Sequence, residues 1–127
     1  MNIFVFGSNS QNEHVALKIA RELNDGLSHN FIESCDPIDF IYESEIFIMD
    51  AVQKINKVTM FNNIKNYEDS QIGSLHEKDL RYFLKISNKL DLNHNVTILG
   101  LPMKGNYNKI KKDVTESLQA LPGYVYQ

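Results

Sequence analysis

Three residues with metal-ligating side chains, Glu13, Asp50 and His76, lie far apart in the sequence. Two carboxylates and one imidazole are ligands that suit a borderline divalent ion such as Ni²⁺, Zn²⁺ or Fe²⁺. Three protein ligands leave coordination positions open, so that another molecule can complete the shell of the ion. These residue types predict a divalent-metal site, provided that the fold brings the three side chains together.

Each of these residues is expected to lie at the start or the end of a helix or strand. A continuous apolar run over residues 3–6 is followed by glycine, which predicts a strand buried on both faces. Glu13 opens the next element, a helix through residue 23 whose apolar positions recur on one face. Asp50 lies at the far end of a second buried strand over residues 45–51. His76 opens a later helix, where the partial positive charge of the helix start favours a neutral imidazole.

The remaining elements complete an alternation of strands and helices. The expected strands cover 29–33, 57–61 and 96–102, and an irregular polar segment covers 62–72. The expected helices are a short one that Asp36 caps and that has Pro37 in its first turn, one from 73 to about 90, and a final helix from 106 that buries Ile110, Val114, Leu118 and Leu121. Such an alternation predicts an α/β fold: a mostly parallel sheet with helices on both faces. Ligands bind such sheets beyond the carboxyl ends of the strands, where the strand order reverses. Glu13, Asp50 and His76 all fall at that edge.

Each of the three residues also has a structural interpretation. Ser10-x-x-Glu13 fits a capping box, in which the glutamate only binds backbone N–H groups at the helix start. An aspartate at the end of a buried strand can cap the following loop, and a single histidine in a first helical turn can be an ordinary surface residue. The shared position at one edge of the sheet is what favours the metal site.

Asp50 also fits a second chemistry, the acceptance of a phosphoryl group. A strand-end aspartate with Lys104 just after the last strand is also found in phospho-accepting receiver domains. Those domains hold Mg²⁺ with an acidic pair at the end of their first strand, where this chain has glycine, serine and asparagine at residues 7–9. The receiver interpretation is therefore the weaker one.

Composition limits the class of protein. The 127 residues predict one domain, 1–127, and 13 Lys and Arg against 16 Asp and Glu give a net charge of −3, which argues against a nucleic-acid partner. A single cysteine excludes an internal disulfide framework. No leader or long apolar segment is evident, so we expect a cytoplasmic protein without membrane insertion.

Four segments, spread nearly end to end, resemble the NiFe-hydrogenase maturation endopeptidases, which trim the C-terminal extension of the hydrogenase large subunit after nickel insertion. The segments are I-F-V-F-G-S-N over 3–9 with Glu13, F-I-M-D-A-V over 47–52, S-L-H-E-K-D-L over 74–80, and T-I-L-G-L-P over 97–102. The resemblance implies a three-layer αβα fold of the phosphorylase/hydrolase type, whose five-stranded sheet has one antiparallel strand, here 57–61.

The resemblance also implies a site and a partner. A glutamate, an aspartate and a histidine of the family contact nickel, and these correspond to Glu13, Asp50 and His76. The implied enzyme has no metal cofactor at rest, since it recognises nickel already bound by the cysteines of the large-subunit precursor. The implied catalytic residues are the same three, with Asp50 as a candidate general base.

Two loops depart from the family pattern. The first loop is shorter and poorer in glycine, and Asn12 precedes Glu13 where the family has an acidic residue. The glycine-rich loop that helps to place the cleavage segment is replaced by Ser-Cys-Asp-Pro at residues 34–37. An alternative is therefore a non-catalytic relative that binds the large subunit or a divalent metal without cleavage.

Overall fold

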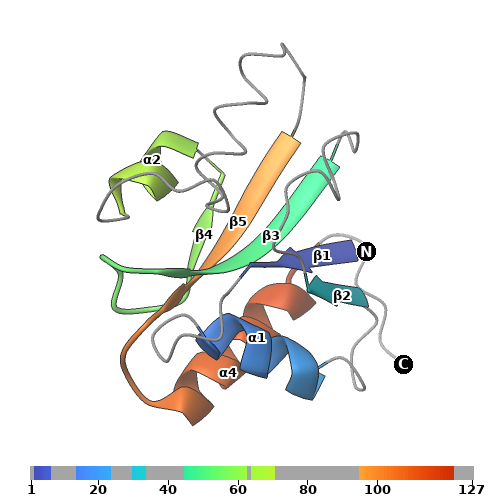
Figure 1. Ribbon diagram of the computed structural model, residues 1–127, viewed down its shortest axis with the longest axis vertical. Helices are drawn as coiled ribbons and strands as arrows, with labels where there is room; N and C mark the ends of the chain where they lie inside the picture. The colour runs from blue at the N-terminus through green and yellow to red at the C-terminus, as the bar shows by residue number, and fades with distance from the viewer. Residues whose placement is uncertain are drawn as a thin grey trace.

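Five strands and three helices make up the described part of the chain (Figure 1). The computed structural model describes residues 2–6, 14–23, 30–33, 45–62, 64–70 and 95–121. The strands are β1 (Asn2–Val5), β2 (Asn30–Glu33), β3 (Glu45–Val52), β4 (Thr59–Phe61) and β5 (Asn95–Pro102). The helices are α1 (His14–Leu23), α2 (Ile64–Asp69) and α4 (Tyr107–Gln119).

The strands form one sheet in the order β2-β1-β3-β5-β4. The first four strands of that order run parallel, and β4 pairs antiparallel with β5 at the edge. The expectation of a mostly parallel five-stranded sheet with one antiparallel strand is confirmed. The antiparallel strand is shorter than expected, because only residues 59–61 pair with β5.

Helices α1 and α4 lie side by side on one face of the sheet (Figure 1). Apolar residues recur along one side of each helix, and this periodicity places them against the strands. The buried cluster on this face consists of Ile3, Val5, Ala16, Leu17, Ile19, Ala20, Leu23, Phe31, Phe47, Met49, Leu99, Leu101, Ile110, Val114 and Leu118. Leu121 was expected to be buried with the other α4 residues, but it is only partly buried because the helix has already ended at Gln119.

The opposite face of the sheet carries a second cluster and helix α2. The buried members of this second cluster are Phe4, Phe6, Ile46, Ile48, Val52, Phe61, Tyr67 and Ile98. Successive residues of a strand point to opposite faces, so β3 contributes alternately to the two clusters. Both faces of β3 are therefore apolar, as the continuous run in its sequence predicts.

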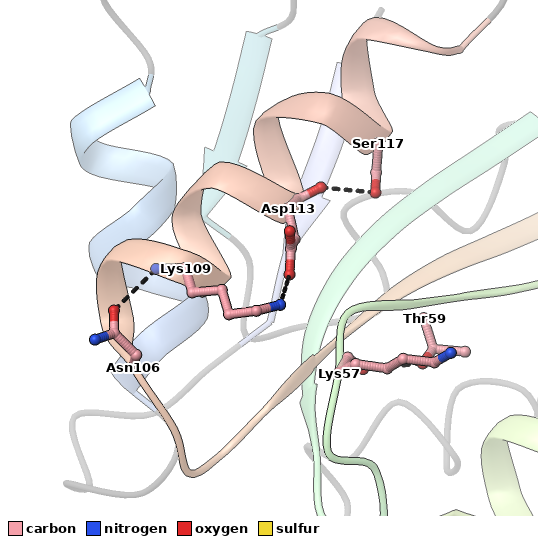
Figure 2. A network of polar contacts seen from close by, with 6 residues as sticks. All are labelled: Lys57, Thr59, Asn106, Lys109, Asp113 and Ser117. Atoms are coloured by element: carbon pink, nitrogen blue, oxygen red, sulfur yellow. Dashed lines mark hydrogen bonds and ion pairs between the residues drawn. The ribbon is translucent and has the colours of Figure 1, made fainter.

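Helix α4 begins with a side-chain cap (Figure 2). Asn106 has extended backbone angles, and its Oδ1 accepts a hydrogen bond of 3.0 Å from the backbone N–H of Lys109. One helical turn further along, Lys109 forms an ion pair of 3.1 Å with Asp113. The cap satisfies a backbone N–H that has no partner within the helix, which explains why the helix begins here.

Helix α2 corrects the expectation of an irregular segment over residues 62–72. Its six residues carry too few apolar side chains to show a helical period, and so short a helix is marginal in isolation. Its stability comes from tertiary contacts: Tyr67 is fully buried against the sheet, and Ser70 closes the last turn. The short helix expected to begin at Asp36 and Pro37 and the helix expected from residue 73 lie outside the described residues.

Candidate functional site

Asp50 lies at the point where β1 and β3 separate. Val5 and Met49 are the last register partners of these strands, and the N–H of Phe6 donates to the carbonyl of Met49 over 2.9 Å. Asp50 is the next residue of β3. The strand was expected to end near Asp50, but it continues to Val52 because β5 remains paired with it.

This position is a topological switch point of the sheet. From β1 the chain moves to β2 on one side, and it then crosses to β3 on the other side of β1. The strand order therefore reverses around β1. Asp50 lies at this point, just beyond the carboxyl end of β1. In open α/β sheets this is the place where ligands bind. The sequence-based placement of Asp50 at this edge agrees with the register.

The carboxylate of Asp50 is held from the α2 side. Tyr67 donates its hydroxyl to Oδ2 of Asp50 over 2.6 Å, a short distance that is typical of a charge-assisted bond. Tyr67 has no exposed surface, whereas Asp50 is half-buried. The pair thus joins a buried donor to an acceptor that retains contact with the surface.

Tyr67 is a site residue that sequence reasoning missed. It lies 17 residues from Asp50, within the stretch expected to be irregular. The available signal was a single aromatic residue in a polar segment that follows a strand ending in Phe61. In the structure the two rings make an edge-to-face contact, with centroids 6.0 Å apart and an interplanar angle of 75°.

The other two expected ligands, Glu13 and His76, lie outside the described residues. The described part of helix α1 covers His14–Leu23, and the expected helix start at Glu13 stays a prediction. Among the described residues, no group of three or more His, Cys, Asp or Glu side chains could hold a metal ion. Of the three expected ligands the described residues contain only Asp50, so the set of three stays a prediction. Lys104, the second residue of the receiver interpretation, is exposed after β5.

A separate polar cluster joins α1 to α4 on the other face of the sheet. Tyr107 donates its hydroxyl to Glu22, Lys111 pairs with the same carboxylate over 3.5 Å, and Lys18 lies 4.3 Å from the centroid of the Tyr107 ring. The hydrogen bond from Tyr107 lowers the pKa of Glu22 from its ordinary 4.5. Burial raises the pKa of Tyr107 above its ordinary value, and the bond to Glu22 adds to the rise. The members of this cluster satisfy one another, which is typical of a structural contact.

The chain resembles known protein structures in its fold. The chain superimposes on the solution structure of an endopeptidase from Escherichia coli with a TM-score of 0.59, over 94% of this chain and 91% of that one, at 14% sequence identity. An uncharacterized protein from Wolinella succinogenes matches with a TM-score of 0.41 and 13% identity, over 86% of this chain and 75% of the other. No family model and no curated protein matches the sequence.

The likeness to the E. coli endopeptidase establishes a shared fold. Because the two sequences are only 14% identical, this likeness assigns no functional role to any residue of the chain. Of the helices in the described ranges, none has the length and apolar character needed to cross a membrane.

Proposed function

We propose that the protein is an endopeptidase that removes the C-terminal extension of a NiFe-hydrogenase large-subunit precursor after nickel insertion. In this proposal Glu13, Asp50 and His76 contact the nickel that the precursor holds, and the reaction takes place in the cytoplasm. The observation that carries the proposal is the position of Asp50: a half-buried carboxylate lies at the switch point of a fold similar to that of an endopeptidase.

The proposed chemistry divides the work between the substrate and the enzyme. Nickel arrives with the substrate, so the enzyme needs no metal cofactor of its own at rest. A divalent ion polarises a carbonyl or a bound water, and this lowers the barrier to attack on the scissile bond. Asp50 takes up the proton of the attacking water as general base, a role that requires hydrogen-bond reach to that water, and returns it to the amine that leaves as the scissile C–N bond breaks. Nickel thereby also signals that the precursor is ready for cleavage.

The test uses the full chain and two forms of one precursor, nickel-loaded and nickel-free. We expect intact-mass spectrometry to show release of a short C-terminal peptide from the loaded form only. Asp50→Asn should abolish release, because an amide cannot take up the proton. A known maturation protease serves as the positive control. If that protease cleaves the loaded precursor and this chain leaves its mass unchanged, the peptidase proposal is wrong.

A second candidate function is binding without cleavage. The observation that favours it is the loop sequence: Ser-Cys-Asp-Pro at residues 34–37 stands where the resembled family has a glycine-rich loop that places the cleavage segment. This candidate predicts that the immobilised chain retains the precursor, or binds Ni²⁺ in a titration, while no peptide is released. The same incubation therefore distinguishes the two functions.

A further inference from the structure

Tyr67 is held by its ring and its backbone, and its helix is tied to a neighbouring segment. Its ring packs edge-to-face on Phe61, its carbonyl accepts from the N–H of Ser70 over 3.1 Å, and the carbonyl of Ser70 accepts from the N–H of Lys54 over 2.9 Å. Helix α2 is therefore tied both to β4 and to the segment that follows β3. A phenol anchored in this way presents its hydroxyl from a constant position.

The carboxylate that accepts the hydrogen bond from Tyr67 belongs to Asp50, whose backbone is also constrained. Asp50 lies in β3, where the next two residues remain paired with β5. The terminal torsion of an aspartate side chain is nonetheless soft, since a bond between sp³ and sp² carbons has broad minima. A bond of 2.6 Å from a fixed, fully buried donor removes this freedom by holding Oδ2 against α2.

We infer that Tyr67 is a positioning residue, which sets the rotation of the Asp50 carboxylate before a divalent ion arrives. Carboxylates that bind metals are commonly oriented by a hydrogen bond from a neighbouring group, and removal of that group costs about 10–100-fold in metal affinity. The metal part of this inference rests on the proposed function, because it takes Asp50 as a ligand of the nickel. The orientation of Asp50 by Tyr67 does not depend on it.

The test compares two variants of the full chain that make the same chemical change. Tyr67→Phe removes the hydroxyl from Asp50 and keeps the ring on Phe61. Tyr107→Phe is the matched control, because it removes a hydroxyl that donates to a different carboxylate, Glu22, on the opposite face of the sheet. Calorimetric titration with Ni²⁺ alone should give an affinity about 10–100-fold weaker for Tyr67→Phe and unchanged for Tyr107→Phe.

A double variant and a spectroscopic measurement separate orientation from loss of structure. In an Asp50→Asn background, Tyr67→Phe should change nickel affinity less than about two-fold, because the ligand that it orients is already altered. Without metal, the side-chain carboxyl ¹³C resonance of Asp50 should shift in Tyr67→Phe and stay in place in Tyr107→Phe.

The outcomes of the two measurements are distinct. If the wild-type chain binds nickel and Tyr67→Phe binds it equally well, Tyr67 does not position a metal ligand and the inference is overturned. If the wild-type chain binds no free nickel, the metal part of this inference is wrong, and the resonance alone decides the orientation. The proposed function, in which the precursor supplies the nickel, is judged separately by the cleavage of the nickel-loaded precursor. An Asp50 resonance unchanged by Tyr67→Phe overturns the orientation as well.

Discussion

Asp50 of β3 and Gly100 of β5 are register partners, and the missing side chain of Gly100 leaves room for the ring that supports Tyr67. A Cβ at Gly100 would lie 2.7 Å from Cε2 of Phe61 and 2.8 Å from Cγ2 of Val52. Phe61 in turn packs on Tyr67, which donates to Asp50. The contacts therefore run from Gly100 through Phe61 and Tyr67 back to Asp50, the residue of the candidate site that pairs with Gly100.

This arrangement predicts that Gly100→Ala destabilises the protein by about 1–3 kcal/mol, because the added methyl group displaces Phe61 and Val52. Urea unfolding of the variant measures the loss. The cost should be smaller when Phe61→Leu is already present, since one of the two close contacts is then relieved. Equal costs in the two backgrounds would show that Phe61 does not fill the space over Gly100.

Two substitutions at Asp50 separate its part in stability from its part in the proposed chemistry. Asp50→Asn keeps an oxygen that accepts from Tyr67 but loses the charge, so we expect a loss of about 1 kcal/mol. Asp50→Ala takes away the acceptor of a buried phenol and should cost roughly 1–3 kcal/mol. Thermal unfolding measures both, and an Asn variant less stable than the Ala variant would contradict this account.

Most of the fold follows from local patterns in the sequence. The apolar run that became β3 and the helical period of α1 each specify an element without help from distant residues. The end of β3 does not follow in this way, since Val52 stays in the strand only because Pro102 of β5 is its partner. In such cases the residue at which a strand ends depends on how far the neighbouring strand pairs with it.

The candidate site was only partly predictable for a related reason. The switch point follows from the order of the elements, so the placement of Asp50 at the carboxyl edge could be expected. The bond from Tyr67 could not, because it spans 17 residues and depends on a helix that tertiary contacts stabilise. No local pattern in residues 62–72 indicates that an aromatic side chain turns toward β3.

The cap of α4 gives a prediction that is independent of the site. Asn106→Ala should cost about 0.5–2 kcal/mol, because the backbone N–H of Lys109 loses the acceptor seen in Figure 2. Asn106→Asp should retain most of the stability, since aspartate is an equally good cap. Asn108→Ala, in the exposed first turn, is the matched control and should change stability by less than about 0.5 kcal/mol. Equal losses at Asn106 and Asn108 would show that the cap contributes nothing.

The contact between Tyr107 and Glu22 predicts how stability depends on pH. The lowered pKa of Glu22 stabilises the fold above its ordinary 4.5, and this contribution is lost as the pH falls through the folded-state pKa. The raised pKa of Tyr107 stabilises the fold below its ordinary 10.0, and this contribution is lost as the pH rises beyond that value. Wild type should therefore exceed Tyr107→Phe in stability most clearly at about pH 7, and by less at about pH 3 or pH 11. Urea unfolding at the three pH values measures the difference, and a difference that stays constant across them would mean that the hydrogen bond does not link the two residues.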